Sequence, residues 1–425
     1  MKIYFDSVGC RLNQAEIEKM AIEFRAAGHE IVETADNADL VIINTCAVTA
    51  AAASDSRQKI RQANRLGVPR IVATGCWATL SPAEAKGLYG VSTVILNSDK
   101  DNLVKQILGG VKDVFDLEPL ERVPLPGIHR RTRAFIKVQD GCNNFCTYCV
   151  TRIARGSSVS MSKQNILDEI LSAEKGGAQE IVLSGVHLGC WGRDLEEKET
   201  ISDLISYLLK VTNIPRIRLS SIEPWDLDEH FFDLWENSRL CQHFHLPLQS
   251  GCSATLKRMA RHTTPELYRS LVNMIRSRMP DAAITTDIIV GFPGETEVDH
   301  AESLEFVKSM QFAEGHVFKF SPREGTAASK LPEKVHGTIA RSRSEEMRNV
   351  LAASHQEYEK RFINRKTEVL WESHTEKING KFHLHGLSGN YLPVCAWSSE
   401  NLWNKISEVR LVSISDTNFE AEILK

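Results

Sequence analysis

The sequence lacks a long apolar run, and none of its uninterrupted hydrophobic stretches approaches the roughly 18 residues of a membrane-spanning helix. The chain also meets an acidic residue at Asp6, before an apolar stretch of export-signal length has formed. No membrane anchor or export signal is therefore indicated. We expect a cytoplasmic protein with no membrane partner.

An excess of positive charge is missing as well. The 51 Lys and Arg residues are outnumbered by 55 Asp and Glu residues, which gives a formal net charge of −4. Bulk attraction to nucleic acid is thereby excluded, so any contact with RNA must come from local patches. The 425 residues, 42% of them hydrophobic and 25% charged, are typical of a globular protein with two or three domains.

Ten cysteines are present, and in a reducing compartment they indicate metal ligation or buried thiols rather than disulfides. Three of them fall in the first hundred residues, where short apolar runs alternate with helical patterns. The predicted strands are Lys2–Phe5, Leu40–Ile43 and Arg70–Ala73, and the predicted helices are Gln14–Ala27 and Ser54–Leu66. This pattern indicates a small parallel α/β sheet. Cys10, Cys46 and Cys76 each follow a strand, and ligands of parallel sheets collect beyond the carboxyl ends of the strands.

A linker is predicted between residues 109 and 133. Its turn-forming residues are Gly109, Gly110, Pro119, Pro124, Pro126 and Gly127. Arg122, Arg130, Arg131 and Arg133 make it locally basic. A solvated connector and an RNA-facing segment both fit this composition.

A second alternating block runs from about residue 134 to 360. The predicted strands are Ala134–Gln139, Glu180–Leu183, Arg216–Ser220, His243–Pro247, Ala283–Val290 and His316–Phe320. The predicted helices are Lys163–Lys175, Ile201–Val211, Leu227–Glu236, Glu266–Met279 and Glu297–Met310. Six strand–helix units predict a partial (β/α)6 barrel, with its chemistry in the loops after the strands.

The last sixty residues contain short strand-like runs at Thr367–Glu372, Gly386–Cys395, Lys405–Val412 and Phe419–Leu424. They predict a small antiparallel β-barrel of the kind that often binds RNA. We interpret its aromatic residues as core rather than as a stacking platform for bases. These residues are Trp371, Tyr391, Trp397 and Trp403.

The loop that follows the first predicted barrel strand holds Cys142, Cys146 and Cys149, in the spacing C-x3-C-x2-C. Three thiolates on a cuboidal iron–sulfur cluster leave one iron free. A tetrahedral zinc site is the alternative, and it needs a fourth ligand that is absent from the nearby sequence. The loop closely resembles that of the radical S-adenosylmethionine (SAM) superfamily, in which an aromatic residue, here Tyr148, precedes the third cysteine. The resemblance implies a [4Fe-4S] cluster that binds SAM, with Tyr148 near the adenine.

The N-terminal cysteines narrow the resemblance to the methylthiotransferase family. Ser7–Gln14, Ile43–Cys46 and Thr74–Cys76 resemble the three cysteine motifs of that family, in which Cys10, Cys46 and Cys76 would bind a second [4Fe-4S] cluster. The resemblance extends through His245–Gly251 and Gly291–Thr296 to the small C-terminal barrel, which the family calls the TRAM domain and which is OB-like. It implies an N-terminal auxiliary-cluster domain over residues 1–115, a radical SAM core over 128–360 and an RNA-binding TRAM domain over 361–425.

The same resemblance implies a reaction. One SAM supplies a methyl group to sulfur at the auxiliary cluster and a second yields the radical that activates a C–H bond. Asn44–Thr49, Ser56–Gln62 and Gly185–Gly189 are similar to the branch that acts on N6-threonylcarbamoyladenosine in tRNA, at carbon 2 of the adenine. Isopentenyladenosine in tRNA and an aspartate of a ribosomal protein are the alternative targets. Implied partners are the tRNA anticodon stem-loop and a reducing protein such as flavodoxin or ferredoxin, and the sulfur donor is not indicated.

Four further residues are predicted to contact SAM because they follow successive barrel strands: Gly185, Ser221, Glu223 and Gln249. No catalytic residue is predicted beyond the cluster ligands.

The family usually has a more arginine-rich run after the cluster loop, whereas here only Arg152 and Arg155 remain. We interpret the other cysteines, Cys190, Cys241, Cys252 and Cys395, as structural. A non-catalytic RNA-binding protein stabilised by metal is the rival from another class.

Overall fold

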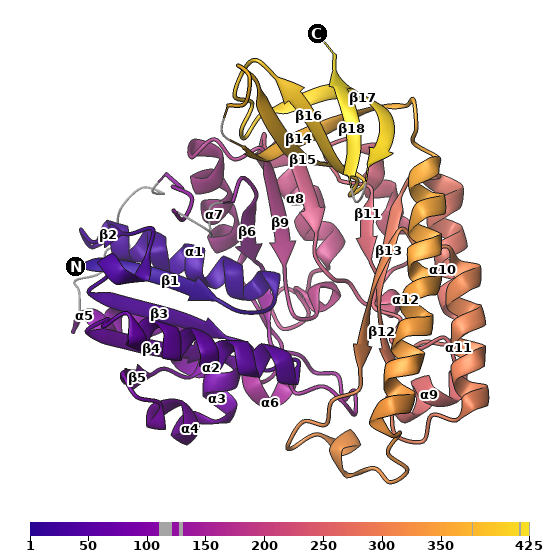
Figure 1. Cartoon of the computed structure of the whole chain (residues 1–425), viewed down its shortest axis with the longest axis horizontal. Coiled ribbons are helices and arrows are strands. Elements are labelled where there is room, and N and C mark those ends of the chain that lie inside the picture. The colour runs from indigo at the N-terminus through magenta and orange to yellow at the C-terminus, as the bar shows by residue number, and fades with distance from the viewer. Residues whose placement is uncertain (110–120, 127–130, 376, 416–417, 425) are drawn as a thin grey trace.

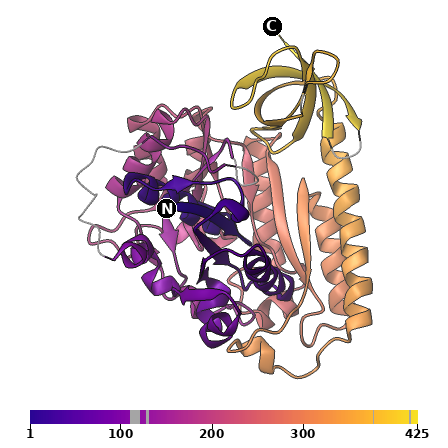
Figure 2. The ribbon, with the colours of Figure 1, turned by 60° about the vertical axis from the view of Figure 1, so that its left-hand side comes forward.

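The computed structural model describes residues 1–109, 121–126, 131–375, 377–415 and 418–424. An N-terminal α/β sheet lies beside a curved set of strands and helices, and a small β-barrel lies at one end of the molecule (Figure 1). Figure 2 shows the second sheet of the central barrel between the N-terminal domain and the long helix α12 (Gly337–Lys360). No helix among the described residues is long and apolar enough to span a membrane.

The N-terminal sheet has five parallel strands in the order β2-β1-β3-β4-β5. They are β1 (Lys2–Ser7), β2 (Glu30–Ile31), β3 (Leu40–Thr45), β4 (Arg70–Gly75) and β5 (Val91–Val94). Helices α1 (Arg11–Ala26), α2 (Ala50–Arg65), α3 (Cys76–Leu80), α4 (Pro82–Gly87) and α5 (Leu103–Leu108) accompany them. Every residue of β3 is buried, as expected for a central parallel strand covered on both faces. The short edge strands β2 and β5 carry no such apolar run, which is why the sequence analysis missed them.

The central block is a six-stranded parallel partial barrel, as predicted. Strands β6 (Ala134–Lys137), β9 (Glu180–Ser184) and β10 (Arg216–Leu219) form one sheet, and β11 (His243–His245), β12 (Ala283–Val290) and β13 (Glu314–Lys319) form the other. Parallel bridges from Ile217 to Leu240 and from Ser221 to His245 join the two sheets. A short antiparallel pair, β7 (Gln139–Asp140) and β8 (Val159–Ser160), extends the loop after β6.

The barrel helices are α7 (Lys163–Lys175), α8 (Ile201–Val211), α10 (Pro265–Arg278) and α11 (Glu297–Met310). The sequence predicts all four to within one residue at each end. Thr200 and Thr296 form capping boxes that fix the starts of α8 and α11. The short helices α6 (Thr151–Arg155) and α9 (Ser253–Arg258) and the 24-residue α12 were not predicted individually.

The helix predicted at Leu227–Glu236 is wrong in type and start. A 3-10 helix covers His230–Glu236 instead. Its buried aromatic residues Phe231, Phe232 and Trp235 pack against one another and against Phe244. Residues three apart lie on the same face of a 3-10 helix, which places Phe232 and Trp235 together against the core.

The C-terminal barrel closes in the order β14-β15-β16-β18-β17. Its strands are β14 (Lys366–His374), β15 (Phe382–Ser388), β16 (Pro393–Ser398), β17 (Ile406–Ser415) and β18 (Asn418–Ile423), of which β16 and β18 pair in parallel and the other neighbours antiparallel. The predicted strand Gly386–Cys395 is wrong, because the chain turns between β15 and β16. Tyr391 in this turn has a left-handed φ of 68°. Trp371 is fully buried as predicted, whereas Trp397 is 47% exposed and does not belong to the core.

Two arginines in the described part of the predicted linker form ion pairs within the fold. Arg122 is buried and pairs with Glu18 of α1 at 3.1 Å, and its guanidinium also donates to the carbonyl of Arg133 at 3.0 Å. The guanidinium of Arg133 in turn pairs with Glu372 on β14. Gly110, Pro119, Gly127 and Arg130 lie outside the described residues, as do the predicted domain limits at 115 and 128, so the division into 1–115, 128–360 and 361–425 stays a prediction.

Candidate active site

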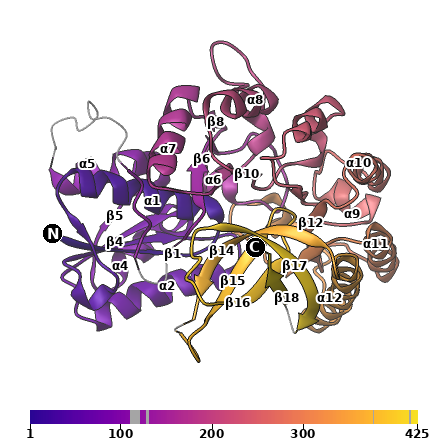
Figure 3. The ribbon, with the colours of Figure 1, turned by 90° about the horizontal axis from the view of Figure 1, so that it is seen from above.

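A cavity of about 510 Å³ lies where the N-terminal sheet, the mouth of the partial barrel and the C-terminal barrel meet. Figure 3, seen from above, shows the yellow C-terminal strands over this side of the molecule. The N-terminal domain contributes Cys10, Arg11, Cys46 and Cys76; the barrel contributes Arg155, Gly185, Ser221, His243, His245, Asp287, Glu314 and His316; and the C-terminal barrel contributes Tyr391. All three parts of the chain therefore line one cavity.

Cys10, Cys46 and Cys76 converge on this cavity because they follow neighbouring strands. Strands β1, β3 and β4 are adjacent and parallel, so their carboxyl ends lie at the same edge. The backbone there is tight: a Cβ atom at Gly9, which has φ 97°, would lie 2.5 Å from the Cys46 sulfur. The predicted gathering of these three cysteines is observed. A set of three free thiols beside an open cavity fits an iron–sulfur cluster with one unfilled corner.

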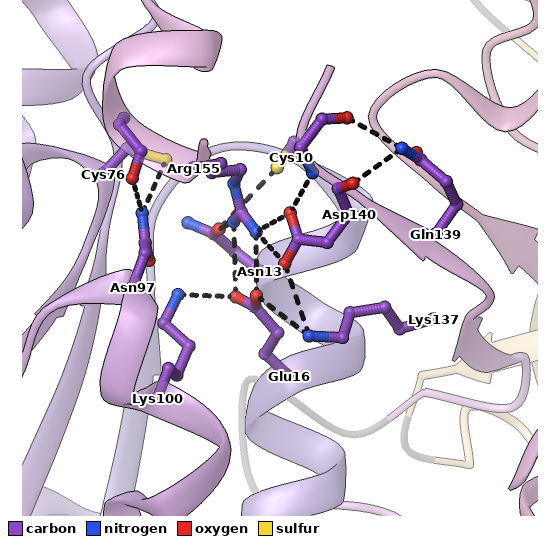
Figure 4. Close-up of polar contacts among 12 residues, drawn as sticks. Cys10, Asn13, Glu16, Cys76, Asn97, Lys100, Lys137, Gln139, Asp140 and Arg155 are labelled. Atoms are coloured by element: carbon purple, nitrogen blue, oxygen red, sulfur yellow. Dashed lines mark hydrogen bonds and ion pairs between the residues drawn. The ribbon is translucent and has the colours of Figure 1, made fainter. Parts of the chain in front are cut away.

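A buried charge network lies beside Cys10 and Cys76 (Figure 4). Arg155 of α6 lies 2.9 Å from both Glu16 and Asp140 and donates to Asn13 Oδ1 at 2.7 Å. Lys100 pairs with the other oxygen of Glu16 at 2.8 Å. Burial raises the pKa of Glu16, but Arg155, Lys100 and Lys137 outweigh it and hold that pKa well below its usual range. The network thus holds the Arg155 guanidinium in place beside the sulfur atoms.

Burial and the positive charge of Arg155 have opposite effects on the pKa of these thiols. Loss of solvent raises the pKa of Cys10 and raises that of Cys46 to about 11, while the positive charge of Arg155 opposes the rise at both. Two asparagines also face sulfur: Cys10 donates to Asn13 Oδ1 at 3.7 Å, and Asn97 Nδ2 donates to Cys76 at 3.7 Å. A hydrogen bond donated to a ligating sulfur, as from Asn97 to Cys76, orients the ligand and tunes its electronics.

Cys142, Cys146 and Cys149 lie in one loop after β7. Gly141 begins the loop with φ 64°, and a Cβ atom there would lie 1.9 Å from the Ser157 carbonyl oxygen. The Cys149 amide donates to the Cys146 carbonyl at 3.0 Å, and the Asn144 amide donates to the Cys142 sulfur at 3.4 Å. Burial raises the pKa of Cys146 and Cys149. This three-thiol set lies close together in a tight loop, as its spacing predicts.

The predicted SAM contacts occupy two environments. Gly185 and Ser221 line the cavity at the ends of β9 and β10. Glu223 pairs with Arg261 at 2.6 Å, and the same guanidinium lies 3.9 Å from the Cys146 sulfur. The ring of Tyr148 packs edge-on against Phe292 at 6.4 Å.

Gln249 is buried with a left-handed φ of 72° and does not line the cavity. Its amide donates to the Asp287 carbonyl and its carbonyl accepts from Ile289, both at 2.8 Å. Backbone pairing with β12 therefore explains the position of this residue in the fold.

A buried cluster of His187, Asp226 and Cys190 lies beside Cys142 and was not predicted from the sequence. His187 Nε2 lies 2.6 Å from Asp226, while its Nδ1 lies 2.9 Å from the Cys190 sulfur and 3.8 Å from the Cys142 sulfur. Histidine and cysteine both follow β9 and the aspartate follows β10, a signal that only the folded barrel makes visible. Cys190, Cys241, Cys252 and Cys395 are all buried, in agreement with a structural role. Arg193 also pairs with Asp226, at 2.8 Å, so the carboxylate already has two partners.

Comparison with known proteins agrees with this arrangement. Residues 136–307 match the model of the radical SAM superfamily, and residues 2–96 match that of the uncharacterized protein family UPF0004. A threonylcarbamoyladenosine tRNA methylthiotransferase MtaB of Bacillus subtilis is 32% identical over 96% of this chain and 93% of its own length. The MtaB protein of Thermotoga maritima is 37% identical over 88% of this chain and 87% of its own length. A tRNA-2-methylthio-N(6)-dimethylallyladenosine synthase of Clostridium tetani is 31% identical over 99% and 95%.

Among solved structures, the radical S-adenosylmethionine methyltransferase TsrM of Kitasatospora setae superimposes with a TM-score of 0.56 at 14% identity. The superposition covers 77% of each chain and supports the shared fold alone. The sequence relatives carry the assignment further, because they match nearly the whole chain at more than 30% identity. The chain is therefore an enzyme and belongs to the radical SAM methylthiotransferase family.

Proposed function

We propose that this enzyme methylthiolates N6-threonylcarbamoyladenosine in tRNA at carbon 2 of the adenine, next to the anticodon. The observation that carries the proposal is the convergence of Cys10, Cys46 and Cys76 on a cavity at the barrel mouth. Thr151 and Arg155, which follow the loop with the three further thiols, also line this cavity. Relatives with the threonylcarbamoyladenosine name reach 37% identity, and the dimethylallyladenosine relative reaches 31%. These identities favour threonylcarbamoyladenosine over dimethylallyladenosine as the substrate.

Two [4Fe-4S] clusters and SAM are the cofactors in this proposal. Cys142, Cys146 and Cys149 would hold the cluster that binds SAM, and Cys10, Cys46 and Cys76 the auxiliary cluster. When bound, these groups supply the radical and the methylthio group. A reducing protein such as flavodoxin or ferredoxin would deliver electrons, and the cytoplasm, where tRNA is modified, is the location that fits.

The chain's own residues position and shield this chemistry. Arg155, Asn13 and Asn97 face the N-terminal thiols with positive charge and hydrogen-bond partners. Gly185 and Ser221 line the barrel side of the cavity and would contact SAM, with Tyr148 and Glu223 nearer the cysteine loop. Three parts of the chain line the cavity and would surround a substrate bound there, which would limit the access of water.

The test is anaerobic reconstitution with iron and sulfide, followed by reaction with SAM, a reductant and tRNA that carries threonylcarbamoyladenosine. The nucleosides are then analysed by mass spectrometry. The expected product is the 2-methylthio form of that nucleoside. Product only from tRNA carrying dimethylallyladenosine, or none from either tRNA by a protein with full iron content, would contradict the proposal.

Paired variants separate the two cysteine sets. Cys146→Ala should abolish SAM cleavage to 5′-deoxyadenosine, whereas Cys46→Ala should retain cleavage and lose methylthio transfer. Cys241→Ala is the matched control, because this buried thiol lies in neither set. Identical losses in the first two variants, with the fold intact, would argue against separate roles.

A further inference from the structure

Arg11 is the first residue of α1 and directly follows Cys10, and its side chain lines the cavity. Its Nη2 donates a hydrogen bond to the hydroxyl oxygen of Tyr391, at 3.0 Å. Within the described part of the chain no carboxylate forms an ion pair with it. The positive charges of Arg133 and Arg218 also act on it.

Other arginines of this region differ in that respect. Arg155 pairs with Glu16 and Asp140, Arg133 with Glu372, Arg218 with Glu180, and Arg261 with Glu223. A cation that is partly removed from water is stabilised by an anionic partner. The charge on Arg11 is therefore available for an anion that enters the cavity.

Tyr391 completes this end of the cavity. Its ring stacks on His243 with 4.1 Å between centroids and an angle of 8° between planes, and the Arg218 guanidinium lies 5.3 Å from its centroid. Because its hydroxyl oxygen accepts from Arg11, its proton remains free to be donated. The turn between β15 and β16 thus brings one donor from the C-terminal barrel to a donor from the N-terminal domain.

Two carboxylates lie on the part of the cavity that β12 and β13 form. Asp287 of β12 and Glu314 of β13 line it, and Asp287 lies 3.2 Å from His245 Nε2. An anionic substrate group would be repelled from these carboxylates and attracted to Arg11. Arg11 and the two carboxylates therefore favour one orientation of an anionic substrate in the cavity. The cavity volume of about 510 Å³ is within the size range of small-molecule sites.

We propose that Arg11 and Tyr391 bind the carboxylate of the threonylcarbamoyl group and thereby select this nucleoside over one with an apolar prenyl group. The inference rests on the proposed function and names the part of the substrate that the site recognises. The guanidinium offers paired N–H donors that match a carboxylate, and the phenol adds a third donor. A dimethylallyl group carries no charge and would leave all three donors unpaired.

Arg11 and Tyr391 would bind any anion, and the RNA offers a backbone phosphate as well as the threonylcarbamoyl carboxylate. Three synthetic anticodon stem-loops distinguish the carboxylate from the phosphate. They carry at the modified position threonylcarbamoyladenosine, its carboxyl methyl ester, or plain adenosine, and all three have identical phosphates. Binding is measured by fluorescence anisotropy with the reconstituted full-length enzyme, for the wild type and for Arg11→Met, Arg11→Lys and Tyr391→Phe.

The wild type should bind the acid more tightly than the ester or plain adenosine. Arg11→Met should lower affinity for the acid about 10- to 100-fold, as expected for loss of a charge-assisted hydrogen bond, and leave the other two stem-loops unchanged. Arg11→Lys should restore part of the difference, and Tyr391→Phe should show a smaller loss. Arg65→Met, on the exposed surface of α2, is the control with the same change in charge and should bind like the wild type.

Equal weakening of all three stem-loops in Arg11→Met would identify a phosphate and overturn the proposal. Unchanged affinity for the acid in that variant would overturn it too. Mass spectrometry of the wild-type product tests the proposed function separately, because it does not depend on Arg11 discriminating the carboxylate. Iron content and unfolding curves of each variant show whether cluster binding and the fold are intact.

Discussion

His187 and Asp226 form a buried pair in which Nε2 of the ring lies 2.6 Å from a carboxylate oxygen, with 3% and 1% of the two side chains exposed. The carboxylate holds the ring in one orientation and points Nδ1 toward sulfur. Burial lowers the pKa of His187, but hydrogen bonds to Asp226, Cys142 and Cys190 outweigh this and raise it to about 12. The ring therefore carries a positive charge and can donate from both nitrogens.

His187→Ala should weaken the iron site formed by the cysteine loop. The variant removes the donor that faces Cys142, and loss of such supporting contacts typically costs about 10- to 100-fold in metal affinity or activity. Less iron per chain after reconstitution and a lower midpoint potential of the loop cluster, measured by EPR-monitored titration, are expected. His230→Ala, on a 92% exposed side chain, is the control. Equal iron content and potential in both variants would contradict this role.

Glu16→Gln should destabilise the contact between the N-terminal domain and the barrel. Glu16 is 3% exposed and neutralises Arg155 and Lys100, so its loss leaves buried positive charge without a partner. The expected decrease in the free energy of unfolding is about 3–5 kcal/mol, measured by urea denaturation. Glu84→Gln breaks the exposed pair with Arg57 and should cost about 0–1 kcal/mol. Comparable losses in the two variants would show that burial does not decide the effect.

Much of the fold follows from periodicity and topology. The apolar run Leu40–Ile43 predicts a central strand, and the buried β3 confirms it. Convergence of Cys10, Cys46 and Cys76 follows from the rule that parallel strands present their carboxyl ends at one edge. These features are local in sequence or depend on strand order alone, which is why sequence reasoning reaches them.

Other features depend on contacts between distant residues. Arg11 and Tyr391 are 380 positions apart, and His187 and Asp226 are 39 apart. No pattern of hydrophobicity or spacing joins such pairs. The exposure of Trp397 was missed for the same reason, since a strand sequence alone does not indicate which face of a closed barrel is inside.

Gly141→Ala should disrupt the cysteine loop. The position combines φ 64° with a Cβ contact of 1.9 Å to the Ser157 carbonyl, so the backbone itself must move. The free energy of unfolding should fall by more than about 3 kcal/mol, and the iron content should fall as well. Gly109→Ala keeps a left-handed φ of 72° but meets nothing within 4 Å, so it should cost roughly 1–2 kcal/mol and retain iron. Normal iron binding by Gly141→Ala would refute the backbone argument.

Trp371→Ala and Trp397→Ala should behave differently although both change the same barrel. Trp371 is fully buried, and its removal should cost about 3–5 kcal/mol. Trp397 is 47% exposed and stacks on His383 at 4.5 Å, so its removal should cost about 1 kcal/mol. Thermal unfolding of the full chain measures both. A larger loss at Trp397 than at Trp371 would mean that the two faces of the barrel have been exchanged.

Glu23→Gln should remove part of the pH dependence of stability. Burial raises the pKa of Glu23 from 4.5 to about 7, and Asp101 and Glu169 add to the rise while Lys19 opposes it. Between pH 4.5 and 7 the folded protein holds this proton and the unfolded chain has lost it, so unfolding becomes easier as the pH rises through that window.

At pH 8 both states are ionised and the folded state retains the full cost of the buried charge, on the order of 2 kcal/mol for a partly accessible group. Glu23→Gln should therefore be more stable than the wild type at pH 8 and nearly equal to it at pH 4.5, where the wild-type side chain is largely protonated. Urea unfolding at a series of pH values measures the difference. A variant that is less stable at pH 8, or whose difference from the wild type does not grow with pH, would show that the Glu23 carboxylate is stabilised in the fold rather than penalised by burial.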